Sequence, residues 1–333
     1  MGRGLARGLA SALLLVSASA LADTRPSLWE SAREPGARTR YALHVTVRQI
    51  LDFESRVPLA RFGALDRART LLEDAQAERS PEPTLRFDLG EVYYALDLHD
   101  EAVRVLVPAL AEHGDHPAGT EALLSLAYSF AKLDRPREER DAYLRFLART
   151  TNDRARVTAT LNLAEAEMRL GNLREAIAGY QEAIALSSSL PQFASSQESG
   201  TLAVWGLAVA QDRSGDPMAA RASATRALGL DPGMALVAHG PNVFFVPEYE
   251  RLWYLALGDE AEAARSPEPR QALRHLRSAE LFWRTYVDKA TGTDRWLAHA
   301  RAHLASAKRA TAAAIARAGK APLVVDPNKV FQF

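Results

Sequence analysis

Residues 161–183, LNLAEAEMRLGNLREAIAGYQEA, decide the fold class of this chain. Apolar side chains recur at three- and four-residue spacing on both sides of Gly171, which predicts two amphipathic helices joined by a tight turn. Small residues at Ala164 and Ala176 let such helices approach closely, and Tyr180 is large enough to fill the space between them. The stretch therefore predicts an antiparallel helix pair.

The same pattern occurs four times between residues 83 and 234. Each copy has a Leu-Gly or Leu-Ala pair, and the positions 12, 16 and 19 residues after its small member form a repeated set. Glu139 and Phe146 stand where the other copies have small side chains, so we expect altered packing in the second copy. The four sets are Gly90 with Ala102, Leu106 and Ala109; Ala127 with Glu139, Tyr143 and Phe146; Ala164 with Ala176, Tyr180 and Ala183; and Ala208 with Ala220, Ala224 and Ala227.

These copies resemble the tetratricopeptide repeat, a helix–turn–helix unit of about 34 residues. The third copy carries the resemblance best, and Leu230-Asp231-Pro232 after the fourth matches the family's exit turn. The resemblance covers residues 83–234. It implies an all-α fold, a right-handed α-α superhelix of stacked helix pairs with diverged helical caps at its ends.

The Pro- and Gly-containing stretches between helical patterns, together with the repeat, predict six regions. Both flanks of the repeats are helical in pattern but match the motif poorly, as terminal repeats of a solenoid commonly do. The regions are a signal peptide (1–22), a linker (23–39), an N-terminal helical cap or diverged repeat (40–80), four repeats (83–234) with a polar loop insertion at 187–200, a C-terminal helical region (235–317) and an extended tail (318–333).

The first 22 residues have the pattern of a secretory signal peptide. Arg3 and Arg7 precede an apolar run, and Ala20-Leu21-Ala22 supplies a cleavage motif before Asp23. The alternative is an uncleaved anchor, but the run is shorter than the roughly 18 apolar residues that span a bilayer. We expect cleavage between Ala22 and Asp23, export, and a periplasmic location without a membrane span; secretion or peripheral attachment to the envelope are the alternatives.

Composition argues against nucleic acid as a partner. Without the two arginines of residues 1–22, 39 basic and 41 acidic side chains remain, so no strong field of one sign draws the chain to DNA, RNA or anionic lipid. The Arg-rich stretch 135–156 is interleaved with acidic residues and favours a solvated face with intrahelical ion pairs.

Motifs for catalysis, cofactors and metals are absent or weak. The chain has no cysteine, no G-x-S-x-G and no Gly-rich phosphate loop. His299 and His303 have the four-residue spacing of two metal ligands on one helix face, but the Glu of a zincin is missing, which favours a packed or solvated face. His113 and His116 favour a plain turn. We therefore expect no enzyme activity, no cofactor and no metal.

The resemblance instead implies a protein-binding groove. In the family, residues just after the Leu-Gly or Leu-Ala pair point into the concave face of the stack. Aromatic and arginine side chains there suit a protein or peptide partner. The implied groove residues are Phe87, Glu91, Tyr94, Tyr128, Lys132, Glu165, Met168, Arg169, Trp205, Asp212 and Arg213.

Lys132, Arg169 and Arg213 occupy matching places in their copies and form a potential cationic rail for acidic side chains or a carboxyl terminus. The Asn residues of the family's carboxylate clamp are missing. The alternative is that the groove residues are solvated or contact the flanking helices.

Two other segments are candidate surfaces. Residues 241–247, PNVFFVP, read either as a core plug or as an aromatic docking patch with the tyrosines and Trp that follow. The apolar tail to Phe333 either frays, lies in the chain's own groove or engages a partner.

These observations favour a non-catalytic scaffold or assembly factor of the bacterial cell envelope. The rivals are an adaptor that works through its aromatic C-terminal half and an envelope enzyme with an unrecognised site. The sequence leaves the oligomeric state and the identity of the partner open.

Overall fold

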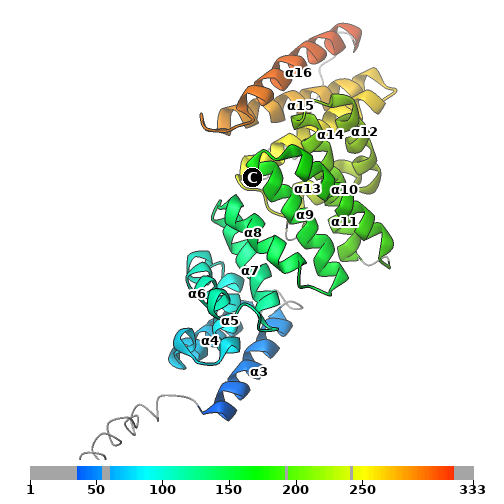
Figure 1. Cartoon of the computed structure of the whole chain (residues 1–333). Helices are drawn as coiled ribbons and strands as arrows, with labels where there is room; N and C mark the ends of the chain where they lie inside the picture. The colour runs from blue at the N-terminus through cyan, green and yellow to red at the C-terminus, as the bar shows by residue number, and fades with distance from the viewer. Residues whose placement is uncertain (1–35, 55–60, 192–193, 241–242, 319–333) are drawn as a thin grey trace, which may run out of the picture. The chain divides into compact units, whose positions relative to one another are not determined.

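The computed structural model describes residues 36–54, 61–191, 194–240 and 243–318, and in these ranges every regular element is a helix (Figure 1). The predicted all-α repeat fold, with further helices flanking the repeats, is confirmed. The predicted signal peptide, its cleavage site at Ala22 and Asp23, and the tail beyond residue 318 lie outside the described residues. The chain divides into two compact units, Met1–Ala122 and Leu123–Phe333.

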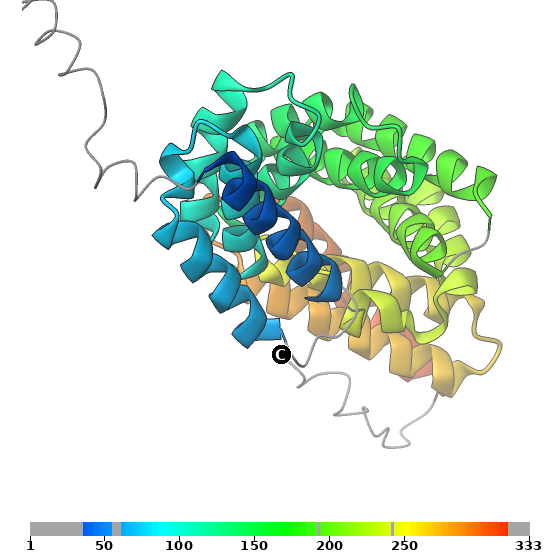
Figure 2. The same ribbon diagram turned by 90° about the horizontal axis from the view of Figure 1, so that it is seen from below.

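The first unit contains the predicted N-terminal cap and the first repeat. Its core joins Val47, Leu72, Leu89 and Val105, each almost fully buried. The two cap helices lie side by side, as the view from below shows in blue (Figure 2). The elements are α3 (Ala37–Glu54), α4 (Arg61–Asp74), the 3-10 turn η2 (Ala77–Arg79), α5 (Pro83–Ala95) and α6 (His99–Glu112).

The second unit begins within α7 and holds the other three repeats and the C-terminal helices. The elements are α7 (Gly119–Lys132), α8 (Pro136–Leu147), α9 (Asp153–Leu170), α10 (Leu173–Ser189), α11 (Ala194–Arg213), α12 (Pro217–Leu230), η3 (Pro232–Met234), α13 (Ala235–His239), η4 (Glu248–Glu250), α14 (Arg251–Arg265), α15 (Pro269–Lys289) and α16 (Leu297–Ala318).

Local sequence explains where many of these helices begin and end. A proline lies in the first turn of α5, α8, α12 and α15, where its missing N–H costs no helical hydrogen bond. Asn152 caps α9 by accepting the backbone N–H groups of Arg154 and Ala155. Gly171 ends α9 with φ +85°, a left-handed conformation that glycine adopts without steric strain. The turn predicted at Gly171 is thus a real helix boundary, and prolines mark the beginnings of four other helices.

The repeat register predicted from the sequence matches the buried positions of the helix pairs. All twelve residues at the 12, 16 and 19 positions are at most 3% exposed. The close approach is visible at Gly90, where a Cβ atom would lie 2.2 Å from Leu106 Cδ2. Small residues at these places therefore let the two helices of a pair pack closely.

The second repeat accommodates its unusual Glu139 through an ion pair. The Glu139 side chain is buried, and Arg169 Nη1 donates to its Oε2 at 2.6 Å. Phe146 lies in the core with no exposed surface. The departure from a small residue is thus compensated by a partner on the next helix pair.

The predicted loop insertion at 187–200 is wrong. α10 continues to Ser189 and α11 begins at Ala194, so most of this stretch is helical. The hydroxyl of Ser188 donates to the carbonyl of Ile184, one turn earlier, and Ser189 donates to Leu186. Serines that bond back to the preceding turn can extend a helix while keeping a polar surface.

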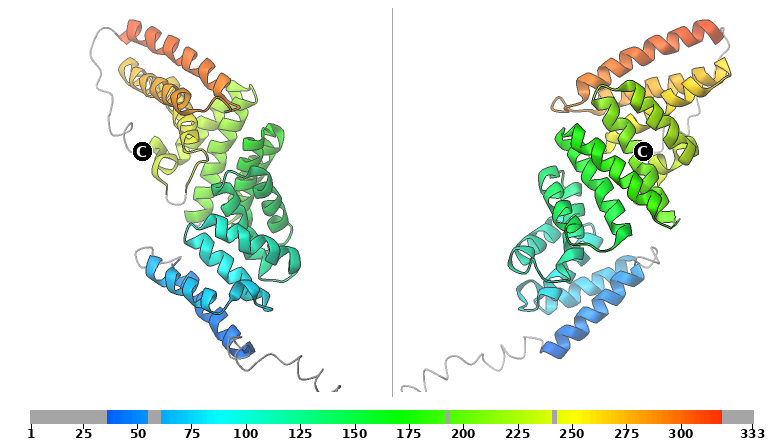
Figure 3. Two further views of the ribbon diagram at one scale, coloured as in Figure 1. Left: turned by 90° about the vertical axis from the view of Figure 1, so that its left-hand side faces the viewer. Right: turned by 45° about the vertical axis from the view of Figure 1, so that its right-hand side comes forward.

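The C-terminal helices share one core with the third and fourth repeats. This core runs from Leu161 to Ala307, and Trp205, Trp253 and Trp283 are completely buried in it. α14 packs against α15 and α15 against α16 at the yellow-to-red end of the chain (Figure 3). The helices after residue 235 are therefore part of the repeat stack's hydrophobic core. None of the described helices combines the length and the apolar character that crossing a membrane would require.

Candidate functional site

A non-helical segment of the chain itself lies in the groove of the second to fourth repeats. Residues Val243–Val246 share a cavity of about 90 Å³ with side chains of α7, α8, α9, α11 and α14. The Lys132 ammonium lies 4.0 Å from the centre of the Phe244 ring, and Phe245 meets Tyr254 at 5.0 Å. Within the described part of residues 241–247, this arrangement favours the plug over the exposed aromatic patch.

The lysine and arginines of the predicted cationic rail all contact groups of the chain itself. Lys132 lies over Phe244, as above. Arg169 pairs with Glu139 and also with Asp134, both at 2.6 Å. Arg213 is 5% exposed and pairs with Glu250 at 2.5 Å. Of the three residues, Lys132 is exposed, Arg169 is partly buried and Arg213 is buried.

Several other predicted groove residues are core residues. Met168 and Trp205 have no exposed surface, and Asp212 is 3% exposed. Trp205 donates its indole N–H to Asp231, and Asp212 accepts that of Trp253 on α14. Assigning these residues and Arg213 to an open groove is therefore wrong. The reason is that α14 and α16 pack against the face that the family pattern leaves open.

Glu165 and Tyr128 keep partly exposed positions on the groove side of their helices. Glu165 accepts hydrogen bonds from the hydroxyls of Tyr180, at 2.7 Å, and Tyr254, at 3.0 Å. Tyr128 meets Tyr143 edge-on, with ring centres 6.1 Å apart. These two residues, Lys132 and Arg169 are the predicted groove residues of the second unit that remain at least partly exposed.

In the first unit, α3 covers the predicted groove residues of the first repeat. Arg48 on α3 donates to Glu91 at 2.6 Å, and Glu91 is only 9% exposed. Phe87 is buried, with its ring 6.0 Å from that of His116. The placement of Glu91 and Phe87 in an open groove is therefore wrong as well, while Tyr94 is half-buried beside His99.

Two of these carboxyl groups have raised pKa values. Burial raises the pKa of Glu139 from its ordinary 4.5 to about 8, against the opposing charge of Arg169. Burial likewise raises the pKa of Glu91 to about 7, although Arg48 lowers it in part. Both groups accept hydrogen bonds from arginines within the fold, Glu139 from Arg169 and Glu91 from Arg48.

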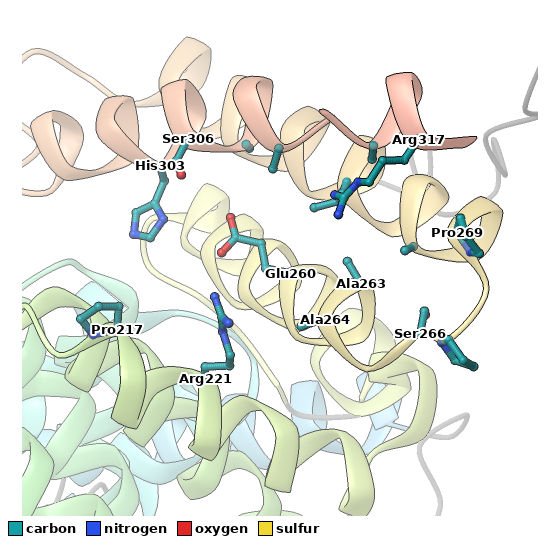
Figure 4. A pocket seen from close by; sticks show the side chains of 16 residues that line it. Pro217, Arg221, Glu260, Ala263, Ala264, Ser266, Pro269, His303, Ser306 and Arg317 are labelled. Atoms are coloured by element: carbon teal, nitrogen blue, oxygen red, sulfur yellow. The ribbon is translucent and has the colours of Figure 1, made fainter. Parts of the chain in front are cut away.

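A second, larger cavity lies between α12, α14, α15 and α16 and has a volume of about 610 Å³. Figure 4 shows His303 reaching into it from α16 and Glu260 from α14, with Arg221 of α12 facing them. Most of the remaining wall consists of alanines and prolines. Sequence reasoning did not find this cavity, because its walls come from helices that are distant in the chain.

His303, which lines this cavity, also lies close to His299 and Asp212. The sequence had singled out the two histidines but not the aspartate as their neighbour. Asp212 is 91 residues from His303, so no local spacing marks it as a third member. The histidines are partly buried and pack on tryptophan rings, as the packed-face interpretation predicted.

Stacked antiparallel helix pairs with a shared core define an α-helical repeat protein. A family model described as tetratricopeptide repeat matches residues 59–126. This match, which covers one part of the chain, and the stacked helix pairs together support a protein of the tetratricopeptide repeat superfamily.

Several solved structures have a similar backbone. MamA protein is 16% identical, with a TM-score of 0.44, over 61% of this chain and 98% of its own. A tetratricopeptide repeat protein from Parabacteroides merdae is 12% identical, with a TM-score of 0.45, over 80% of this chain and 99% of its own. The search of curated proteins gave no match.

Proposed function

We propose that this protein is a non-catalytic scaffold that binds an extended apolar segment of a partner protein in the groove where Val243–Val246 lies. The observation that supports the proposal is the seating of that segment. A non-helical stretch with two phenylalanines already packs there against repeat residues, which supports a groove that can hold such a ligand.

The contacts suggest which features a partner segment would need. An aromatic side chain at the place of Phe244 would meet the Lys132 ammonium, a cation–π contact of about 0.5–1 kcal/mol at an exposed site. A second aromatic at the place of Phe245 would pack edge-on against Tyr254. The partner would thus carry two neighbouring aromatics in extended chain.

The rival interpretation, an adaptor working through an aromatic C-terminal half, loses its main surface. Trp253, Trp283 and Tyr286 have no exposed area and serve the shared core. The groove therefore offers the better-supported surface for a partner.

A peptide added in trans tests the groove directly. Phe244→Ser/Phe245→Ser should weaken the seating of the chain's own segment. We expect a labelled PNVFFVP peptide to bind this variant at least tenfold more tightly than the wild type in fluorescence anisotropy. A PNVSSVP peptide should bind neither protein.

Two further variants locate the binding. Adding Lys132→Ala to the double variant should weaken peptide binding, whereas Arg174→Ala, whose side chain is 92% exposed on α10, should not. Equal peptide binding by wild type and double variant, or none by either, would argue against the groove as a peptide site. With a native partner captured on the double variant, excess PNVFFVP should elute it and PNVSSVP should not.

We also propose that the protein is exported and acts in the bacterial envelope, in the periplasm. The pattern of residues 1–22 supports this proposal. N-terminal sequencing of the protein from its native cells should begin at Asp23. A chain that still carries residues 1–22 and stays with the membrane fraction would favour the anchor instead.

A further inference from the structure

Three potential metal ligands from two distant helices meet at one place in the second unit. Asp212 lies in the last turn of α11, and His299 and His303 lie four residues apart on α16. One ligand atom of each residue lies within 4.8 Å of the others. Within the described ranges, this is the group of histidine and acidic side chains with the geometry for an ion.

The surroundings hold these side chains in place. The indole N–H of Trp253 donates to Asp212 Oδ2 at 2.9 Å, and His303 Nε2 lies 2.9 Å from the same oxygen. The His303 ring stacks on Trp283 at 4.3 Å, and both histidine rings meet the edge of Trp253. Metal ligands in proteins are commonly oriented by such outer hydrogen bonds and apolar walls.

The local charge also suits a cation. Asp212 is buried, and His303 Nε2 lies 2.9 Å from its carboxylate, within ion-pair distance. Glu260 is a second carboxylate close by, held by the indole N–H of Trp283 at 2.8 Å. The nearby Arg213 guanidinium is paired with Glu250 and so does little to neutralise Asp212. Arg221, across the cavity, is the other cation facing this group.

We propose that Asp212, His299 and His303 bind a divalent transition-metal ion, with zinc as the best fit. Two imidazoles and one carboxylate are a common zinc donor set, and the chain has no cysteine to offer a softer one. Binding places the metal where His303 Nε2 now contacts the Asp212 carboxylate. The two histidine rings, nearly parallel at 11°, rotate to aim their nitrogens at the ion.

Three protein ligands leave one position of a tetrahedral ion for water or another small ligand. His303 borders the 610 Å³ cavity, so that position is accessible from it. The ion would also join α16 to α11, since its ligands come from both helices. This proposal is independent of the peptide groove.

Zinc titration of the untagged chain tests the site. After treatment with a chelator and its removal, calorimetry with ZnCl₂ should show saturable binding of one equivalent. Asp212→Asn keeps an acceptor for Trp253, and His299→Gln keeps a polar side chain of similar size. Each should weaken zinc binding at least tenfold, while His239→Ala, which removes an exposed histidine of α13, should leave it unchanged.

Two readouts guard against misfolded variants. Circular dichroism must match the wild type for a variant to count, and cobalt in place of zinc should give the intense visible band of tetrahedral coordination. Zinc should raise the melting temperature of the wild type and of His239→Ala but not of the other two. No saturable binding to the wild type, or equal binding to all four proteins, would overturn the proposal.

Discussion

Glu139 stands where the other repeats place alanine, and its burial beside Arg169 makes the fold sensitive to pH. The buried carboxyl has a pKa of about 8, above the 4.5 of an exposed glutamate. Its contribution to stability is therefore full below pH 4.5 and is lost as the pH rises through about 8, because the unfolded state ionises first.

We accordingly expect Glu139→Gln to flatten the pH dependence of stability. Between pH 5 and pH 8 the wild type should lose unfolding free energy relative to the variant by up to about 1.4 kcal/mol per pH unit. Urea melts at pH 5, 6.5 and 8 measure this difference. Glu138→Gln is the control: Arg135 lowers the pKa of Glu138, so its titration lies below this range. Parallel curves for wild type and Glu139→Gln would show that Glu139 ionises normally.

Substitutions at Gly215 and Gly229 distinguish the effect of backbone conformation on stability from the effect of packing. A Cβ atom at either position would meet nothing within 4 Å, but Gly215 has φ +87° and Gly229 is inside α12. Gly215→Ala should cost about 1 kcal/mol, whereas Gly229→Ala should stabilise by about 0.5–1 kcal/mol. Thermal melts of the two variants against wild type measure both. Shifts of the same sign would contradict the conformational explanation.

At the scale of elements, α16 packs on the shared core, and we expect substitutions on its buried side to destabilise the second unit. Ala300 is fully buried in that core, while Ala298, two residues away, is exposed. Ala300→Glu would bury an uncompensated charge and should lower the unfolding free energy by about 3–5 kcal/mol. Tryptophan emission should shift to the red as Trp253 and Trp283 lose their cover.

Ala298→Glu provides the matched control for this change. It introduces the same charge on the opposite side of α16 and should leave stability within about 0.5 kcal/mol of the wild type. If the two substitutions had equal effects on the urea midpoint, α16 would not be packed as described.

The sequence was sufficient to predict helix boundaries and the repeat register, but not that other parts of the chain cover most of the predicted groove residues. Pro83 begins α5 and Gly171 ends α9, and each acts on backbone only a few residues away. Such boundaries can therefore be predicted from short stretches of sequence. The serines near 188 were misread because a hydroxyl bonded to the preceding turn looks, in sequence, like a loop residue. Arg213 was misplaced because its partner, Glu250, lies 37 residues further on.

At the scale of the whole molecule, the two units have separate cores and distinct spectroscopic probes. The described tryptophans, at 205, 253, 283 and 296, all lie in the second unit. Far-ultraviolet circular dichroism reports helices of both units, whereas tryptophan fluorescence reports chiefly the second. A difference between the two melting curves would therefore reveal unfolding in two steps.

Two core substitutions test this expectation. Leu89→Ala in the first unit should cost about 2–5 kcal/mol and move the circular dichroism curve while leaving the fluorescence midpoint in place. Leu252→Ala in the second unit should move the fluorescence midpoint. If Leu89→Ala shifts both curves equally, the chain unfolds as one cooperative unit.

The segment Val243–Val246 has a further consequence for any ligand of its groove. Because it is tethered, it competes at an effective concentration, which is in the millimolar range for short flexible links. A partner present at micromolar concentration must therefore bind the groove about a thousandfold more tightly than the segment does to displace it. The tethered segment therefore prevents weakly binding proteins from occupying the groove. Only a partner whose affinity exceeds this threshold would displace the segment.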